Sequence, residues 1–212
     1  MAFVSGVGSG LSQSRVAQRS VCKANGAALK MEGKSASVPF LTKPEKLDGS
    51  MAGDVGFDPL GFSNYLSLEY LRESEIKHGR VAMLACLGIW IQEIVHLPGK
   101  EFSNPLATEA FFQVPAGGIA QIFLACGLAE FIGHRGKMTY MDIAADKERK
   151  PGAMGFDPLN MSKGKSAEAM KKLELNEVKN GRLAMIGVGG LIHAMFISHQ
   201  PTLFQLAHFK PL

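Results

Sequence analysis

The stretch Glu75-Ile-Lys-His-Gly-Arg-Val-Ala-Met83 returns later in the chain as Glu177-Val-Lys-Asn-Gly-Arg-Leu-Ala-Met185. Each copy follows a Gly-Phe-Asp-Pro-Leu box, the first at residues 56–60 and the second at residues 155–159. Both copies lead into long apolar runs without internal proline, which favour a helix over a strand. The repeat therefore predicts two helices that form a pseudo-twofold pair.

The glutamate and the arginine of each copy are five residues apart, about 140° around a helix with 3.6 residues per turn. Each arginine is better placed for the glutamate of the other helix, so the repeat predicts the ion pairs Arg80–Glu177 and Arg182–Glu75. Charges in an apolar environment need such partners, and losing one partner is expected to destabilise the pair by roughly 3–5 kcal/mol. The glycine before each arginine allows the close helix approach that the pairs require.

Each copy also carries a neutral donor three residues after its glutamate, His78 in the first and Asn180 in the second. Residues three apart share a helix face, and a glutamate paired with arginine still has lone pairs to offer. A magnesium ion in a neutral macrocycle needs an uncharged or charge-balanced ligand, a condition that Glu75, His78, Glu177 and Asn180 all meet. The spacing fits equally well a structural ion-pair bundle in which His78 and Asn180 are satisfied polar residues.

A third interpretation is a di-iron carboxylate bundle enzyme, whose site needs two Glu-x-x-His motifs and a glutamate from each of two more helices. Here the second copy is Glu-x-x-Asn, and an arginine follows each motif after two residues. The middle apolar segment offers only Glu130, and the sequence has no fourth long apolar segment. The sequence therefore disfavours an iron site.

Three segments carry most of the apolar residues, at about 67–96, 117–133 and 166–198. None has about 20 residues free of charged or polar groups, but their centres are hydrophobic all round, as in buried or lipid-facing helices. Basic residues gather between the second and third segments, a positive-inside pattern. We expect an all-α membrane protein with three transmembrane helices, the N-terminus on the cytosol-like side, and a short amphipathic helix at 201–209.

The composition excludes several classes of protein. The 212 residues carry a net charge of +4, with 46% hydrophobic and 20% charged residues; this excludes a disordered chain and indicates no nucleic-acid partner. The three cysteines form neither a C-x-x-C nor a zinc pattern. The first 31 residues are basic and serine-rich without Asp or Glu, which is typical of a transit peptide. We expect a transit peptide at residues 1–32 and the three-helix domain at 33–212.

The doubled motif with its two boxes resembles the light-harvesting chlorophyll-binding protein family over about residues 37–208. The nine residues 76–84 and the stretch Val114-Pro-Ala-Gly-Gly-Ile-Ala-Gln121 are most similar to the red-lineage branch that serves photosystem I. The resemblance implies a non-enzymatic protein of the chloroplast thylakoid membrane with its N-terminus on the stromal side. The implied cofactors are chlorophyll a, with or without a second chlorophyll, and carotenoids of the xanthophyll type.

The resemblance also implies roles for individual residues. Helices one and three would cross and be locked by the two ion pairs, and two carotenoids would lie in their grooves. The carotenoid ends would lie near the boxes, whose loops Asp58 and Asp157 would hold. The chlorophyll magnesium ions would be ligated by residues of the repeat, and the arginines would complete these binding sites: Glu75, His78, Glu177 and Asn180, with Arg80 and Arg182.

Three further positions resemble pigment ligands: Gln121, Glu130 and His193. The plant pattern has an arginine three residues after the glutamate of the second helix, but here Gly133 occupies that position, which leaves the charge compensation of Glu130 open. His134 lies near a helix end, where solvation at the membrane interface is expected. His96, His199 and His208 are expected to be solvated in the same way.

The expected function is that of an antenna, in which pigments at fixed separations pass excitation energy to photosystem I. The implied partners are the photosystem I core, neighbouring antenna proteins and thylakoid lipid. The alternative within the family is a photoprotective protein that dissipates energy. A lumenal acid sensor needs clustered acids on the loop opposite the basic side, where only Glu101 and Glu109 lie, so dissipation is the minor interpretation.

Overall fold

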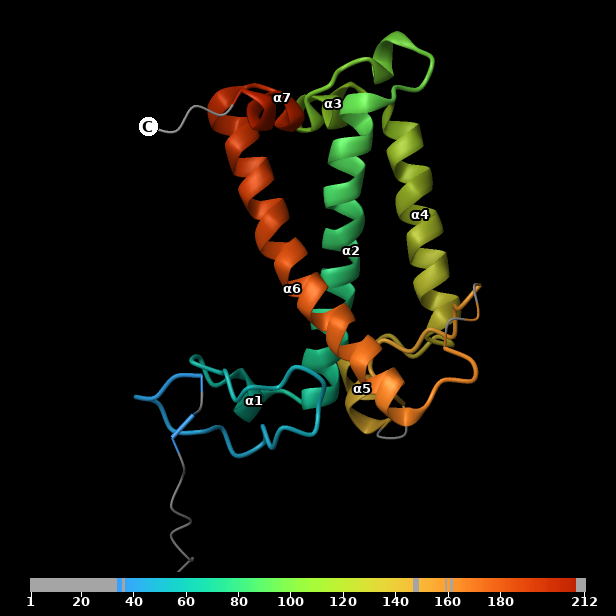
Figure 1. The fold of residues 1–212 in the computed structure, drawn as a ribbon. Helices are drawn as coiled ribbons and strands as arrows, with labels where there is room; N and C mark the ends of the chain where they lie inside the picture. The colour runs from blue at the N-terminus through green and yellow to red at the C-terminus, as the bar shows by residue number, and fades with distance from the viewer. Residues whose placement is uncertain (1–33, 36, 147–148, 159, 161, 209–212) are drawn as a thin grey trace, which may run out of the picture. The chain divides into compact units, whose positions relative to one another are not determined.

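The computed structural model describes residues 34–35, 37–146, 149–158, 160 and 162–208. The expected transit peptide at residues 1–32 lies outside this part and stays a prediction. Within the described part, the regular elements are helical apart from one isolated antiparallel bridge. Their order along the chain (Figure 1) is α1 (Phe62–Tyr65), α2 (Leu68–Ile94), η1 (Lys100–Phe102), α3 (Ala107–Gln113), α4 (Ala116–Gly133), α5 (Tyr140–Ala145), α6 (Ala167–Ser198) and α7 (Thr202–Ala207).

The three long predicted helices are confirmed as α2, α4 and α6, each within two residues of its expected bounds. The starts of α2 and α6 repeat each other. Ser67 Oγ accepts from the backbone N–H of Tyr70 at 3.4 Å, and Ser166 Oγ accepts from that of Ala169 at 3.3 Å. A serine that accepts from the third residue onward is a favoured helix N-cap, which explains why both helices begin where they do.

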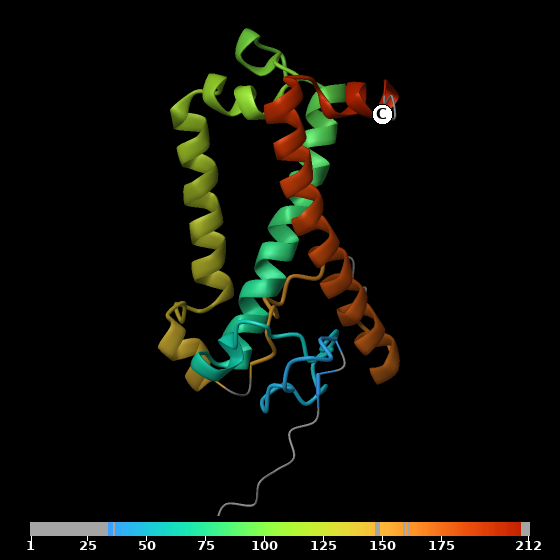
Figure 2. The same cartoon turned by 90° about the vertical axis from the view of Figure 1, so that its left-hand side faces the viewer.

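Helices α2 and α6 pack against each other and cross, as Figures 1 and 2 show. Gly79 and Gly181, the glycines of the repeat, are both buried at the crossing. A Cβ atom added to Gly79 would lie 2.9 Å from Gly181 Cα, and one added to Gly181 would lie 3.0 Å from Gly79 Cα. The two backbones are therefore in contact, and each position requires glycine.

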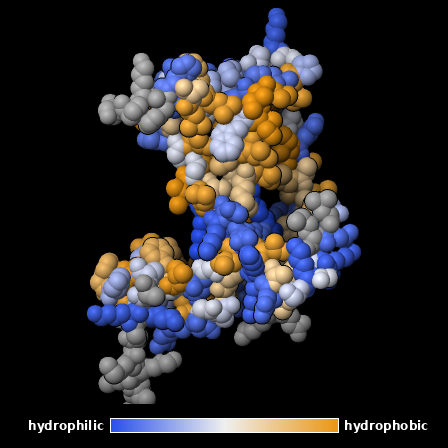
Figure 3. Space-filling model, in the orientation of Figure 1, coloured by the Kyte–Doolittle hydropathy of each residue, from blue (hydrophilic) through white to orange (hydrophobic). Residues whose placement is uncertain are grey.

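Helix α4 runs beside this pair, but none of its residues is buried (Figure 1). Its large side chains are mostly exposed, among them Phe123 at 70% and Leu124 at 75%. Hydrophobic surface also gathers over the upper part of the face drawn in Figure 3. Apolar surface on this scale needs a covering other than water.

By length and composition, α4 and α6 are able to cross a membrane. Helix α2 is long enough at 27 residues, but its apolar part, residues 77–94, retains Lys77, Arg80 and Glu93. The all-helical fold is confirmed, and the three membrane spans remain a prediction. The region expected to form an amphipathic helix contains α7, while the short helices α3 and α5 were not predicted because they span too few residues to show a periodic pattern.

Candidate functional site

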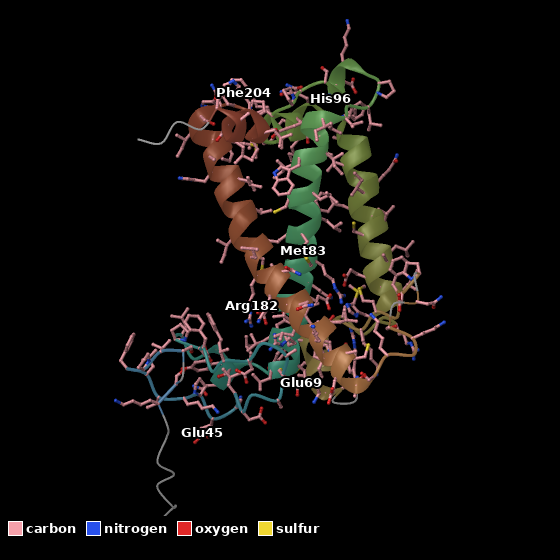
Figure 4. The ribbon with its side chains drawn as sticks, in the orientation of Figure 1. Glu45, Glu69, Met83, His96, Arg182 and Phe204 are labelled. Carbon is pink, nitrogen blue, oxygen red and sulfur yellow. The ribbon has the colours of Figure 1, made fainter. Side chains whose placement is uncertain are left out.

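Both predicted ion pairs between α2 and α6 are confirmed. Arg80 Nε donates to Glu177 Oε1 at 2.7 Å, and Arg182 Nε donates to Glu75 Oε1 at 2.6 Å. Figure 4 shows Arg182 near the place where α6 crosses α2. The four side chains are between 28% and 39% exposed, so the pairs flank the glycine contact and face outward from it.

Each arginine also holds the chain segment that precedes a box. Arg80 Nη1 donates to the carbonyl of Gly152, and Arg182 Nη1 donates to that of Gly53, both at 2.9 Å. The two glycines stand three residues before the box glycines, and both have positive φ, 77° and 74°. This role of the arginines was not predicted from the sequence. The glycine that stands three residues before each box could have indicated it, because it is present in both copies.

The expected loop-holding role of the box aspartates is confirmed. Asp58 accepts from the backbone N–H groups of Phe62 and Ser63 at 3.0 and 2.9 Å. Asp157 accepts from the backbone N–H of Ser162 at 2.9 Å. Burial alone would raise the pKa of Asp58, but the hydrogen bonds from Ser63 and Phe62 outweigh it and hold the pKa below its ordinary value.

A cavity of about 570 Å³ lies between the first box, the start of α2 and α6. Its polar lining comprises Glu75, Arg72 and Arg182 with Asp54, Asp58 and Ser63, and its other walls are mainly apolar. An apolar ring or chain with a polar end fits such a cavity. The apolar lining includes Leu47, Met51, Val55, Phe57, Phe62, Leu68, Leu71, Met185 and Ile186.

His78 is exposed on α2, and its Nδ1 lies 2.8 Å from the carbonyl oxygen of Ser74. A carbonyl only accepts, so Nδ1 carries the proton and Nε2 keeps a free lone pair. A metal-ligating histidine commonly donates the N–H of its other ring nitrogen in a hydrogen bond of this kind, which fixes the orientation of the ring. His208 has the same geometry, with Nδ1 at 3.1 Å from the carbonyl of Phe204 and its ring stacked on that of Phe204. Sequence reasoning had treated His208 only as a solvated side chain.

The other candidate ligands are separate from one another. Asn180 and His193 are exposed on α6, and Gln121 is exposed on α4. None of the three side chains receives or donates a hydrogen bond within the described part of the chain. Glu177 Oε2 likewise has no donor among the described residues, whereas Glu75 Oε2 accepts from Arg72 Nη1 at 2.7 Å.

The structure shows which residues compensate the charge of Glu130. Lys77 on α2 donates from Nζ to Glu130 Oε2 at 2.7 Å, and His134 Nε2 lies 2.9 Å from the same oxygen. The expectation that His134 is solvated was wrong, because its side chain is 1% exposed. The ring is buried between α2, the end of α4 and the segment that follows α5, where Arg149 contacts Nδ1.

Glu73 completes this cluster and was not identified from the sequence. Its side chain is 4% exposed and accepts from the backbone N–H of Gly152 at 2.6 Å and from Arg149 Nη2 at 3.2 Å. Lys77 Nζ lies 3.7 Å from Glu73 Oε1. We call Glu73, Lys77, Glu130, His134 and Arg149 the polar cluster.

The described residues include no group of three or more His, Cys, Asp or Glu side chains placed to hold a metal ion. This part of the chain therefore offers nothing in support of a di-iron site. What it presents instead is a set of separate, outward-facing oxygen and nitrogen donors that are neutral or paired with a cation. Each is suited to one axial bond to a metal whose other ligands come from a cofactor.

Comparisons with known proteins agree with this chemistry. The profile of the family described as "Chlorophyll A-B binding protein" matches residues 43–196. A fucoxanthin-chlorophyll a-c binding protein of Chattonella marina var. antiqua is 39% identical over 181 residues, which cover 82% of this chain and 75% of that protein. Photosystem I chlorophyll a/b-binding protein 6 of Arabidopsis thaliana is 35% identical over 189 residues, covering 80% and 68%. A chlorophyll a-b binding protein of Petunia hybrida is 35% identical over 172 residues; the alignment covers 72% of this chain but 62%, less than two-thirds, of that relative.

Proposed function

Because the chain belongs to the chlorophyll a-b binding protein family, whose members are non-enzymatic light-harvesting antennas, we propose that it passes excitation energy to photosystem I. It is a chlorophyll-binding protein of the chloroplast membrane system, and the thylakoid is the membrane that we propose. Bound chlorophyll and carotenoid supply light absorption and energy transfer. The protein's part is to fix the pigments in place. The observation that carries the proposal is the doubled Glu–Arg pair with a neutral donor beside each glutamate.

We propose that α2, α4 and α6 all cross the membrane, with the N-terminus on the stromal side. The charges of α2 support this, because each charged group in its apolar part is partnered. Lys77 pairs with Glu130, and Arg80 pairs with Glu177. Glu93 accepts from the first two backbone N–H groups of α7, those of Thr202 and Leu203, at 2.6 Å each. The preceding residues 1–32 are proposed to be a chloroplast transit peptide.

The ligands proposed for chlorophyll magnesium fit the group chemically. Glu177 is balanced by Arg80, Glu75 is held by both Arg182 and Arg72, and the free Nε2 of His78 and the amide oxygen of Asn180 are neutral. Gln121 and His193 are neutral and exposed on α4 and α6, and Glu130 is balanced by Lys77. His208 joins the set because its ring is held like that of His78.

The exposed apolar surface of α4 supports pigments and lipid as its covering. A helix of 18 residues with none buried gains little stability from packing against the described part of the chain. Bulky apolar cofactors between α4 and the α2–α6 pair would supply that packing. The cavity of about 570 Å³ beside the first box is the place that we propose for one end of a carotenoid.

One variant tests a single ligand of this set. We expect His193→Leu to lose one chlorophyll with little change in helicity, because the side chain is exposed and makes no hydrogen bond with a described residue. Pigment extraction and protein quantification of the reconstituted variant measure the loss. An unchanged chlorophyll-to-protein ratio would show that His193 does not ligate a chlorophyll and has only a packing role.

The proposed partner is photosystem I. It is supported by the similarity to the Arabidopsis photosystem I protein and by the motif resemblance at residues 76–84 and 114–121. Mild solubilisation of thylakoids, followed by separation of the photosystems, tests this partner. We expect the protein to migrate with photosystem I and to raise its antenna cross-section. Migration with photosystem II alone would overturn the proposal.

A further inference from the structure

We infer that Lys77 is the positioning residue for a chlorophyll ligated by Glu130, so that α2 supplies the charge balance for a ligand on α4. The inference rests on the proposed function, because it assumes that Glu130 ligates magnesium. Glu130 lies in the last turn of α4, and the lysine lies on α2, in the interval between Glu75 and His78. Lys77 is therefore part of the repeat in sequence, but in space it contacts α4, the long helix outside the repeat.

The first step is that Glu130 keeps one oxygen available. Lys77 Nζ and His134 Nε2 both lie against Oε2, at 2.7 and 2.9 Å. No described residue donates to Oε1. A carboxylate held through one oxygen by a cation leaves the other free for a metal. The same division is present at Glu177, where Arg80 holds Oε1 and no described residue donates to Oε2.

The second step is that the polar cluster is electrically balanced. Glu73 and Glu130 each carry a negative charge, and Lys77 and Arg149 each carry a positive one. The charges of these four side chains sum to zero, which is the condition under which such groups are tolerated in an apolar environment. His134 lies among them, with Nδ1 against Arg149 and Nε2 against Lys77 and Glu130 Oε2.

The third step is that α4 itself supplies no cation that could replace Lys77. Position 133, where the plant pattern has arginine, is glycine, and a Cβ there would lie 2.9 Å from Met154 Cε. Arg135 lies beyond the end of α4, in a left-handed conformation. Within the described residues, the ammonium of Lys77 forms an ion pair with Glu130, and His134 Nε2 lies 2.9 Å from the same carboxylate oxygen.

The cluster also explains how α4 is located without packing. Its residues are unburied along the whole helix, and its C-terminal end is joined to α2 by Lys77–Glu130 and by the contacts of His134. A shift of α4 relative to α2 would therefore alter the Glu130 site directly.

Lys77→Met tests the inference, with Lys179→Met as the matched control. Lys179 is the counterpart of Lys77 in the second copy and is exposed without an ion pair among the described residues. All variants are reconstituted as the full three-helix chain with extracted chlorophylls and carotenoids, and the chlorophyll-to-protein ratio and the absorption difference spectrum are recorded. We expect Lys77→Met to lose one chlorophyll, the same band that Glu130→Leu removes. Lys77→Arg and Lys179→Met should keep the full complement.

The decisive variant is Lys77→Met combined with Glu130→Gln. A glutamine offers the same neutral oxygen and needs no cation, so we expect the double variant to regain the chlorophyll that Lys77→Met loses. The double variant is expected to bind this chlorophyll even if Lys77→Met alone fails to assemble. Loss of the same chlorophyll in the double variant, or a full complement in Lys77→Met, would overturn the role of Lys77. Retention of every chlorophyll by Glu130→Leu would instead overturn Glu130 as a ligand, and a wild-type chain that binds no chlorophyll would overturn the proposed function.

Discussion

The two copies of the repeat share a backbone arrangement but differ in the charges around their glutamates. In the first copy, Glu75 accepts from Arg182 through one oxygen and from Arg72 through the other. In the second copy, Glu177 accepts from Arg80 through one oxygen, and the position that corresponds to Arg72 is Glu174. The first glutamate is therefore held by two cations and the second by one.

The contacts to the box segments show the same contrast. Glu73 on α2 accepts from the backbone N–H of Gly152, whereas its counterpart on α6, Leu175, lies beside Gly53 through its methyl group. Both ends of the pseudo-twofold pair share the arginine hydrogen bond; one end adds the hydrogen bond to Glu73, and the other adds the apolar contact of Leu175. The symmetric parts of the repeat are those that set the helix crossing, and the asymmetric parts are those that differentiate the two binding sites.

The largest effect is expected at the element that both copies share. Gly79→Ala places a Cβ 2.9 Å from Gly181 Cα, and no side-chain rotation relieves a contact with backbone. The helices must separate, so both ion pairs weaken together. We expect a loss of several kcal/mol and failure to assemble a pigmented complex, measured by reconstitution yield and thermal unfolding.

Gly88→Ala is the matched control on the same helix, because a Cβ there meets nothing within 4 Å. Its yield should equal that of the wild type. If Gly79→Ala assembles as well as Gly88→Ala does, the close backbone contact is not what sets the crossing.

Replacing the arginine of each copy is expected to reduce stability by different amounts. Arg80→Leu leaves Glu177 without a cation, and we expect destabilisation of up to about 3–5 kcal/mol in the membrane. Arg182→Leu leaves Glu75 paired with Arg72, so a smaller loss is expected, about half as large. Thermal stability of the two reconstituted variants, with their chlorophyll content, measures the difference. Equal losses in the two variants would show that Arg72 does not compensate Glu75.

The box aspartates give a smaller, pH-dependent effect. The pKa of Asp58 is lowered in the folded protein, so its contribution is present above the ordinary carboxyl pKa and is lost as the pH falls through the folded value. We expect Asp58→Asn to lower stability by about 1 kcal/mol at neutral pH, as for a lost helix cap. Acid titration of stability in detergent should show the wild type converging on the variant below about pH 4. A gap that stays constant as the pH falls well below 4 would contradict this role.

The smallest effect on stability is expected from a substitution that makes the two copies more alike. Glu174→Arg gives Glu177 a neighbour of opposite charge three residues away, where the native residue has the same charge. We expect a gain of about 0.2–0.5 kcal/mol, and a partial rescue of Arg80→Leu because Glu177 regains a cation. Unfolding curves of the single and double variants measure both. A double variant no more stable than Arg80→Leu would show that position 174 does not reach Glu177.

The repeat predicted the helix pair and its two ion pairs because each copy carries a glutamate and an arginine on faces that cannot meet within one helix. The apolar runs predicted the bounds of α2, α4 and α6 for similarly local reasons. The Lys77–Glu130 pair was not predictable in this way, because it joins two helices that no repeat relates. Glu73 and His134 were missed since their burial depends on where the segment with Arg149 returns, which helical periodicity does not specify.

The most direct test is an absorption and fluorescence excitation spectrum of the purified, detergent-solubilised protein, together with a pigment extract. An antenna with pigments held at fixed, short separations gives strong red chlorophyll bands and chlorophyll emission sensitised by carotenoid. A protein that is helical by circular dichroism yet colourless would contradict the account and leave the repeat as a charge-locked helix pair alone.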